Sequence, residues 1–331
     1  MVRATKFRLA FIAVVGGALA LYMLMSIGFK PILVAASAVG WGGFASLCIY
    51  QVGQFVVLGI AWCALVPASC RARPRVFIWA RMVRDATSEL LPFSHLGGIV
   101  LGARTAIAHG VPQPVAFGSI VTDITTEMLA QVAFTTAGVV ILLTSAPHNS
   151  AAFSVTSSAG LGLMSIIVGC AAFVAFQRYC LALTTKLILR LFPTAGPVTQ
   201  SVVNCVREVY RQPAKVGLAV LFHCAGWLAS ALSTWIALAL MGVHPRVLPV
   251  LAIESLVCAA RSIAFWMPNG IGVQEVAYAA IAPLFGIGAE IGLATSLLKR
   301  ARDIAVGVPI LLLWQWSEGR RLLQVTDAAV D

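Results

Sequence analysis

The sequence contains six apolar runs, each near the length that a helix needs to cross a bilayer, about 20 residues. They fall at residues 9–28, 45–66, 114–143, 153–177, 216–241 and 290–316. Hydrophobic residues make up 60% of the 331 positions, and charged residues only 11%. A soluble chain of this length could not bury so much apolar surface. The sequence therefore predicts a single integral membrane domain over residues 1–331, an all-α polytopic protein with about six full transmembrane helices.

Two further apolar regions, 76–109 and 247–285, are interrupted by "LPFSHLGG" and "MPNGIG". Proline removes a backbone donor and glycine permits a sharp reversal, so each stretch should break a helix. The predicted turn residues are Pro92, Gly97, Gly98, Pro268, Gly270 and Gly272. We therefore predict two re-entrant helical hairpins whose second limbs begin near Gly98 and Gly272. The amide hydrogens at the start of each second limb would suit an anionic or strongly polar group.

The distribution of basic residues favours re-entrant hairpins over full crossings. Sixteen basic residues gather in four segments, namely Arg3, Lys6 and Arg8, then Arg71, Arg73, Arg75, Arg81 and Arg84, then Arg178, Lys186, Arg190, Arg207, Arg211 and Lys215, then Arg320 and Arg321. With two re-entrant hairpins all sixteen lie on one side, together with both termini. The positive-inside rule assigns that side to the cytoplasm, so we expect a multi-pass protein with both termini in the cytoplasm. Segment 178–215 is expected to be an amphipathic linker on the membrane surface.

A shift of 176 residues superimposes the two halves of the chain. Pro92 falls on Pro268, Gly110 on Gly286, and Glu127 on Asp303. The halves, approximately 45–143 and 216–316, would have opposite orientations in the membrane, unless the match is a chance similarity of apolar sequences. Inverted repeats with broken helices near the midplane are a recurrent transporter architecture. We therefore expect the two hairpins to face each other across a polar cavity.

Charged residues occur inside two of the predicted spans. Asp123 and Glu127 lie at i,i+4 in one span, and Lys299 and Asp303 at the same spacing in the other. Arg300 and Arg302 lie beside Lys299 and Asp303. A charge at the bilayer centre costs roughly 2.5 kcal/mol or more, so these side chains should pair or line a hydrated path. A structural ion-pair cluster, a role in substrate or proton handling, and a position at the membrane interface all remain open.

Other candidates for contacts with a substrate headgroup flank the broken segments. They are His95, Arg104, Arg261, Asn269, Gln274 and Glu275. An arginine fork can hold a phosphate with two hydrogen bonds, although snorkelling or helix capping would explain the same residues. A lone histidine such as His95 is more often structural, and His109, His148, His223 and His244 indicate nothing specific. No nucleophile–base pattern, phosphate loop or clustered cysteines occur, so we expect no enzyme activity, cofactor or metal.

Two stretches resemble signatures of a known family. "LPFSHLGGIVLGAR" followed by "GVPQPVAFGSIVTDITTEMLA" is similar to the first signature of the lysylphosphatidylglycerol synthase transmembrane-region family. "MPNGIGVQEVAYAA" resembles its second, a Pro-Gly-Gly-x-Gly-x-x-Glu pattern, in which Pro268, Gly270, Gly272 and Glu275 match and Asn269 replaces a glycine. In the first signature Gly98 stands where a glutamate is common, and Arg104 keeps the basic position. The likeness covers about residues 10–320, and the variant looks most like the hopanoid-associated branch called HpnL.

The resemblance implies a flippase-like protein of the bacterial inner membrane that moves a hopanoid or related lipid. Its expected partners are membrane lipids, either hopanoid or phospholipid, and proteins of the hopanoid pathway, with no nucleic acid. The soluble aminoacyl-transferase domain of the full synthases has no counterpart in this chain, so lysine transfer is not expected. Two alternatives stay open. A lipid-modifying enzyme would need a cavity lined by His95, Asp123 and Glu127, and a non-catalytic scaffold for hopanoid biosynthesis would have a tightly packed interior.

Overall fold

The computed structural model describes residues 39–67, 70, 73–91, 94–145, 196–263 and 272–327. Every regular element in these residues is a helix, in the order α3 (Gly40–Ala64), α4 (Pro74–Leu90), α5 (Ser94–Ala108), α6 (Gln113–Ser145), α8 (Gly196–Tyr210), α9 (Pro213–Leu240), α10 (Val247–Ile263), α11 (Val273–Ile281), the 3-10 helix η3 (Ala282–Phe285) and α12 (Ala289–Asp327). The prediction of an all-helical polytopic membrane protein is confirmed. The predicted spans at 9–28 and 153–177 lie outside the described residues.

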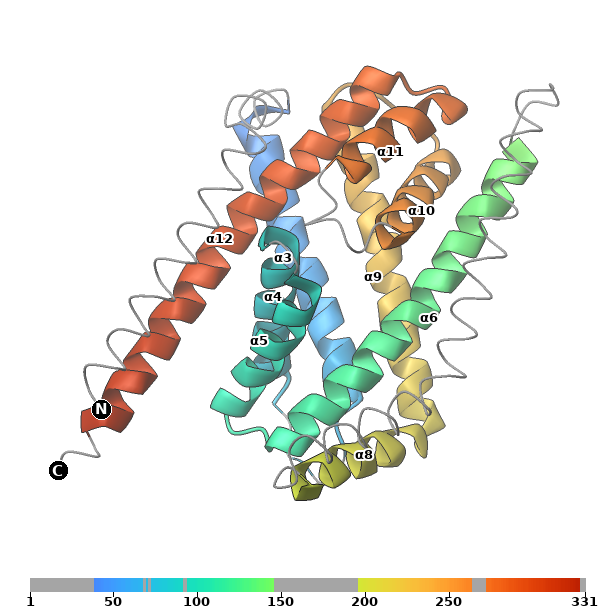
Figure 1. The fold of residues 1–331 in the computed structure, drawn as a ribbon. Helices are drawn as coiled ribbons and strands as arrows, with labels where there is room; N and C mark the ends of the chain where they lie inside the picture. The colour runs from blue at the N-terminus through green and yellow to red at the C-terminus, as the bar shows by residue number, and fades with distance from the viewer. Residues whose placement is uncertain are drawn as a thin grey trace.

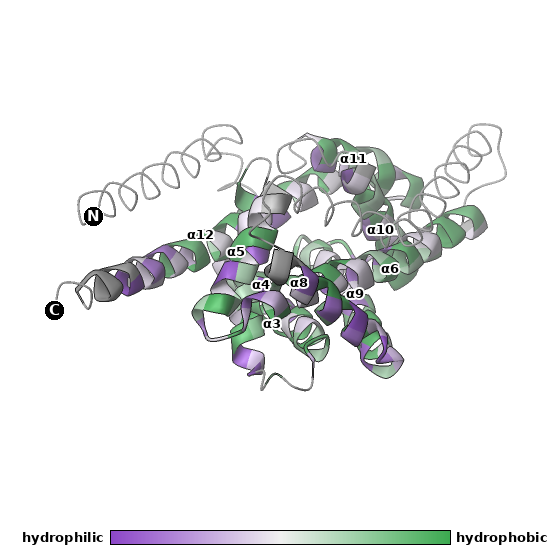
Figure 2. Ribbon diagram, turned by 60° about the horizontal axis from the view of Figure 1, so that its bottom comes forward, coloured by the Kyte–Doolittle hydropathy of each residue, from purple (hydrophilic) through white to green (hydrophobic). Residues whose placement is uncertain are grey.

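Three of the described helices, α3, α6 and α9, are long and apolar enough to cross a membrane. The shortest, α3, has 25 residues and is about 37 Å long, more than the hydrocarbon core requires. Hydrophobic residues predominate along α6, whereas α8 carries more hydrophilic ones (Figure 2). Large apolar side chains such as Ile49 and Leu221 are exposed on the outer surface, where lipid would cover them. These helices confirm the predicted helical runs at 45–66, 114–143 and 216–241.

The four helices of the two interrupted segments are shorter than the about 20 residues that a membrane span needs. α4 and α10 have 17 residues each, α5 has 15 and α11 has nine. α4 packs along α5 and α10 along α11, and Figure 1 shows the two pairs entering the bundle from opposite ends. The turn residues Pro92, Pro268, Asn269 and Gly270 lie outside the described residues.

The glycines of the predicted turns have different roles. Gly272 has a φ of 83° directly before α11, as expected for a turn glycine. Gly97 and Gly98, in contrast, lie inside α5, which begins four residues earlier than predicted, at Ser94. A Cβ atom at Gly98 would lie 2.6 Å from the carbonyl oxygen of Arg84. Gly98 therefore permits the close approach of α5 to α4, and the prediction that it starts the second limb is wrong.

The second limbs of the two hairpins end in the same way. Gly110 and Gly286 have φ angles of 90° and 77°. Their neighbours make matching hydrogen bonds, because the Val111 amide donates to Ala106 at 3.2 Å and the Ile287 amide to Ala282 at 3.1 Å. Ala106, Gly110 and Val111 lie 176 residues before Ala282, Gly286 and Ile287, respectively. Both helices thus stop in the left-handed glycine turn that commonly ends helices.

The remaining helices enclose the two hairpins. α12 has 39 residues, longer than the predicted span 290–316, and packs against α11, α4 and α3. α8 lies across the lower end of the bundle in Figure 1. Its buried face consists of Cys205, Val206 and Val209, and its other face is largely exposed. The amphipathic pattern predicted for 178–215 is present in α8, while residues 178–195 lie outside the described residues.

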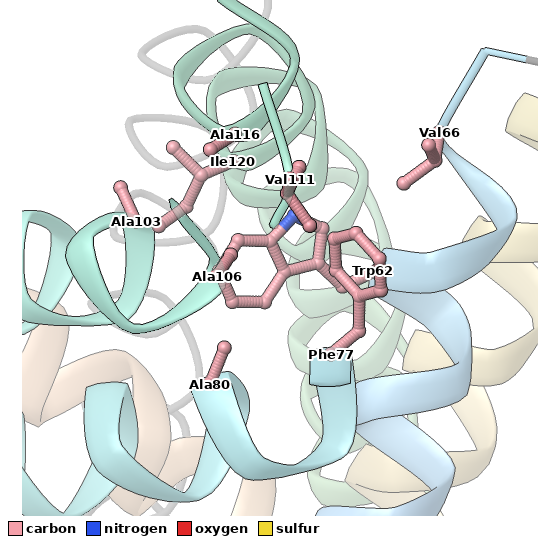
Figure 3. Close-up of a cluster of buried hydrophobic side chains, with 9 residues drawn as sticks. All are labelled: Trp62, Val66, Phe77, Ala80, Ala103, Ala106, Val111, Ala116 and Ile120. Carbon is pink, nitrogen blue, oxygen red and sulfur yellow. The ribbon is translucent and has the colours of Figure 1, made fainter. Parts of the chain in front are cut away.

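A hydrophobic cluster fixes the position of the first hairpin. Figure 3 shows side chains of α3, α4, α5 and α6 converging around Trp62. The rings of Trp62 and Phe77 meet edge to face with centroids 5.5 Å apart, and the indole N–H donates to Ser119 at 3.0 Å. Arg81 follows Phe77 by four residues, so it lies one helical turn further along the same face of α4. The cluster therefore directs Arg81 towards the interior and α6.

Candidate functional site

A cavity of about 500 Å³ lies between the two hairpins. Residues of α3, α4, α6, α9, α10, α11 and α12 line it, together with Ile99 of α5. Its wall carries five cationic side chains, Arg81, Arg84, Arg261, Lys299 and Arg302, and five carboxylates, Asp85, Glu89, Glu127, Glu254 and Asp303. The volume is within the range of small-molecule sites, about 300–1,000 Å³. The expected polar cavity between the hairpins is therefore present, and the formal charges of its wall cancel.

The first group of charges, which we call the arginine cluster, consists of Arg81, Arg84 and Asp85 of α4, Asp123 and Glu127 of α6, and His223 of α9. Arg81 lies 2.7 Å from Asp85, 3.1 Å from Asp123 and 2.6 Å from Glu127. Arg84 lies 2.5 Å from Asp123 and 2.7 Å from Glu127. His223 Nε2 is 3.1 Å from Asp123 Oδ1. The i,i+4 carboxylates of α6 thus each contact both arginines of α4.

The burial of the two arginines corrects their predicted location in a cytoplasmic loop. Arg81 is 2% exposed and Arg84 is 9% exposed, within a helix that begins at Pro74. Asp123 is completely buried in α6, so its charge requires counter-ions inside the protein. Arg81 and Arg84 were among the sixteen basic residues used to predict the topology, and they act instead as counter-ions to Asp123 inside the protein.

The second group, which we call the lysine cluster, consists of Glu254 of α10, Tyr278 of α11, Lys299 of α12, and Ser230 and Thr234 of α9. Lys299 Nζ lies 2.5 Å from Glu254 Oε1, 3.0 Å from the Tyr278 hydroxyl and 3.1 Å from that of Thr234. Glu254 also accepts hydrogen bonds from Ser230 at 2.6 Å, from Thr234 at 2.7 Å and from Tyr278. Hydroxyl groups therefore complete the coordination of this single ion pair.

α12 carries two further arginines that form ion pairs. Arg302 lies 2.8 Å from Asp303 and donates to the Ser233 hydroxyl at 2.7 Å. Arg300 lies 2.7 Å from Glu275, whose other oxygen accepts the Gly272 amide at 2.9 Å. The start of α11 is thus occupied by its own Glu275. The prediction that its amide hydrogens are free for an anionic group is wrong for Gly272.

One ion pair joins the two hairpins directly. Arg261 of α10 lies 2.9 Å and 2.8 Å from the two carboxylate oxygens of Glu89 of α4. Both side chains are about one-third exposed, at 31% and 33%. Nearby, Gln131 of α6 donates to Ser262 of α10 at 2.5 Å. All four of these side chains line the cavity, and we call the Arg261–Glu89 pair the cross-hairpin link.

The predicted site residues occupy three kinds of position. Six of them line the cavity, namely Glu127, Arg261, Gln274, Lys299, Arg302 and Asp303. Asp123, Glu275 and Arg300 lie outside the lining and form ion pairs. The Arg104 side chain is 53% exposed and pairs with Glu318 of α12, away from the cavity. The His95 side chain and Asn269 lie outside the described residues.

Several cavity residues were not predicted from the sequence, including Arg81, Arg84, Glu89, Glu254 and His223. Glu254 could have been found, because it is an isolated carboxylate in an apolar segment and carries the same desolvation cost as Asp123. His223 lies in an apolar span and is completely buried. A single histidine in such a run gives no sequence signal that separates it from a structural residue.

Comparison with protein families gives a match over most of the chain. Residues 8–310 match the model of the lysylphosphatidylglycerol synthase TM region. Neither the curated proteins nor the solved structures give a match. The family match covers most of the chain, including both hairpins and the whole cavity. The chain therefore belongs to the lysylphosphatidylglycerol synthase transmembrane-region family.

Proposed function

We propose that this protein translocates a lipid across the bacterial inner membrane by passing the polar headgroup through the cavity while the tails remain in the bilayer. The observation that carries the proposal is a cavity of about 500 Å³, lined by ten formally charged side chains, inside a bundle with an apolar outer surface. Keeping such charges at membrane depth costs free energy, so they commonly mark a substrate or ion pathway. Membership of the family supports a function in membrane lipid metabolism.

The charge balance of the cavity suggests the kind of headgroup. Five cations and five carboxylates line the wall, so the cavity has no excess positive charge that would favour an anionic headgroup. A neutral head rich in hydroxyl groups can donate to the carboxylates and accept from the arginines. A hopanoid with a polyol head, or a related lipid, has this chemistry, and we propose it as the substrate class.

We further propose that the two hairpins belong to an inverted repeat and alternate in opening the cavity to the two sides. Their entry from opposite ends and the matching turns at Gly110 and Gly286 support this arrangement. The cross-hairpin link would then break in each cycle. Both termini are assigned to the cytoplasm, as the basic residues predict.

Transport agrees better with the cavity than the alternatives do. A scaffold would be expected to have a packed interior, whereas this interior contains a polar space. The enzyme alternative needs a cavity lined by His95, Asp123 and Glu127, whereas Asp123 lies outside the lining and both carboxylates pair with two arginines. We propose that the protein catalyses no covalent step.

Reconstitution into liposomes tests the proposal. Fluorescent lipids with a polyol, a zwitterionic or an anionic head would be added separately, and dithionite would quench the label in the outer leaflet. We expect protein-dependent movement that is fastest for the polyol head, with empty liposomes as the control. Absence of protein-dependent movement for all three lipids, with the protein shown to be folded, would refute transport.

A further inference from the structure

The arginine cluster differs from the other ionic groups of the described residues in its charge balance. The lysine cluster and the Arg302–Asp303 pair together hold equal numbers of cations and carboxylates, as do the three isolated pairs Arg261–Glu89, Arg300–Glu275 and Arg104–Glu318. The arginine cluster contains two arginines and three carboxylates. Without a further positive charge it has a net charge of −1 in a buried position. An uncompensated buried charge is strongly unfavourable.

His223 is placed to supply the missing charge. Its side chain is completely buried, and Nε2 lies 3.1 Å from Asp123 Oδ1. Nδ1 has no hydrogen-bond partner within the described residues, although His223 belongs to the cavity lining. Arginine keeps its proton under all ordinary conditions, whereas the charge of histidine ordinarily changes between about pH 5 and 8. His223 is therefore the group at which the charge of the cluster can change.

Other charges near α9 do not supply this compensation. α3 presents the neutral Gln51 and Gln54, and α8 contributes no residue to the cavity lining. α10 and α12 present Cys258 and five charged side chains, Glu254, Arg261, Lys299, Arg302 and Asp303. Glu89 of α4 pairs with Arg261, so the six formal charges cancel. α4 and α6 present the arginine cluster itself. The described charges around His223 therefore sum to −1, the charge that a protonated imidazole would balance.

We propose that His223 is a proton-binding site that makes lipid transport depend on proton movement, an inference that rests on the proposed function. The protonated ring would keep Nε2–H on Asp123 and would present a second N–H at Nδ1 to a water or headgroup oxygen from the adjoining cavity. On release, the Nδ1–H bond breaks, its electron pair stays on the nitrogen, and the proton passes to that oxygen. The neutral Nδ1 then accepts a hydrogen bond from a headgroup hydroxyl. Proton binding and headgroup binding thus use the same nitrogen.

Nuclear magnetic resonance can test the proton site without any transport assay. The full chain, with ¹⁵N-labelled histidine rings, would be titrated from pH 5 to pH 9 in bilayers of phosphatidylethanolamine and phosphatidylglycerol. We expect one pair of ring signals, absent from His223→Gln, to lose the proton at Nδ1 and to retain it at Nε2. His109→Gln, which alters a histidine bonded to the Thr105 carbonyl on α5, is the matched control. A His223 ring that keeps one protonation state across the whole range would overturn the proposal.

A second variant tests whether charge balance is the cause. Asp85→Asn removes one carboxylate of the cluster, while the ion pairs of Asp85 are with Arg81 and Arg84 and not with His223. The pH-dependent change in the His223 ring signals should then differ from that of the wild type, because the arginine cluster holds two arginines and only two carboxylates. Arg104→Ala, which lies outside the cavity, should leave the titration unchanged. An unchanged titration in Asp85→Asn would overturn the charge-balance explanation.

Transport under an imposed pH gradient tests the coupling. In liposomes carrying the polyol-headed fluorescent lipid, the wild-type rate should change severalfold with the direction of the gradient. The rate of His223→Gln should not respond to the gradient. A wild-type rate that ignores the gradient would overturn the coupling. If the wild type moves no lipid, the proposed function fails as well, while the titration still decides whether His223 binds a proton.

Discussion

The arginine cluster and the lysine cluster have the same construction with opposite polarity. In the first, the hairpin helix α4 carries the cation Arg81 and the following long helix carries the carboxylate Asp123. In the second, the hairpin helix α10 carries the carboxylate Glu254 and the following long helix carries the cation Lys299. Asp123 and Lys299 are 176 residues apart, the spacing of the glycine turns. An ion pair between hairpin and long helix is thus present in both halves, with the signs exchanged.

The two clusters also differ in the uncharged or titratable groups that contact their carboxylates. Three hydroxyl groups, from Ser230, Thr234 and Tyr278, satisfy Glu254 beside Lys299, and the charges there balance. A histidine completes the arginine cluster, and its charge can change. The comparison assigns a fixed structural role to the lysine cluster and a changing role to the arginine cluster. The following predictions test this difference, from the largest expected effect to the smallest.

Arg81→Met should be the most destabilising substitution. Arg81 contacts three carboxylates, and its loss leaves them short of a counter-ion in a buried position, at a cost of about 3–5 kcal/mol in the free energy of unfolding. Lys299→Met should cost less, about 2–3 kcal/mol, because three hydroxyl groups still donate to Glu254. Unfolding in mixed micelles with increasing sodium dodecyl sulfate, followed by tryptophan fluorescence, measures both.

Arg81→Lys is the control for this comparison. Lysine keeps the positive charge but lacks the rigid fork that reaches three carboxylates. Arg81→Lys should therefore lower the free energy of unfolding by less than Arg81→Met does. If Lys299→Met proves as damaging as Arg81→Met, the two clusters do not differ in the way described.

One glycine in each half lies where two helices touch, and the two should tolerate alanine equally poorly. A Cβ atom at Gly59 of α3 would lie 2.5 Å from Ile78 Cα of α4, and one at Gly292 of α12 would lie 2.5 Å from the carbonyl oxygen of Tyr278 of α11. Both neighbours are backbone atoms, so Gly59→Ala and Gly292→Ala should each cost about 1–3 kcal/mol in the same unfolding assay. Gly53→Ala, with no atom within 4 Å of its Cβ, is the matched control and should cost nothing. A tolerated Gly59→Ala would contradict the close packing of the first hairpin on α3.

Breaking the cross-hairpin link should affect transport more than stability. Arg261 and Glu89 are about one-third exposed, so Arg261→Ala should change the free energy of unfolding by no more than about 1 kcal/mol. The transport rate in liposomes should change severalfold, because the link joins the two hairpins that are proposed to separate. Glu89→Gln, which keeps the shape of the partner, should have an effect in the same direction. Unchanged transport in both variants would remove the link from the proposed mechanism.

Arg104→Ala should have the smallest effect. Its side chain is 53% exposed and pairs with Glu318 outside the cavity, so the expected change in stability is about 0–1 kcal/mol. Its transport rate should equal that of the wild type. A large loss of transport would assign Arg104 to the headgroup path despite its position.

The helices could be predicted because their signals are local. The apolar runs that became α3, α6 and α9 are long enough to be recognised by length and composition alone. The two interrupted segments contain proline and glycine, and both give short helices. The role of Gly98 could not be predicted, since its contact with the Arg84 carbonyl oxygen depends on how α5 packs against α4.

Residues of the candidate site could be predicted only where a single side chain stands out in the sequence. Asp123 and Lys299 stand out as charges in apolar spans, and both are buried in ion pairs. The side chains that pair with them come from other helices and depend on how those helices pack. Arg81 belongs to a basic stretch that is typical of a cytoplasmic loop, and only the packing of α4 on α6 places it in the interior. Arg104 is the last residue of the first family signature, yet it lies outside the cavity lining.

The most direct test of the central claim is the transport rate of Gln51→Leu in liposomes containing the polyol-headed lipid. Gln51 of α3 lines the cavity, and its Oε1 has no partner within the described residues, so the substitution removes cavity polarity without removing an internal hydrogen bond of that oxygen. Ile49→Leu, on the exposed side of the same helix, is the control. We predict that Gln51→Leu slows transport about 5–10-fold, as the loss of one hydrogen bond to the headgroup would do, and that Ile49→Leu has the wild-type rate. A wild-type rate in Gln51→Leu would contradict passage of the headgroup through this cavity.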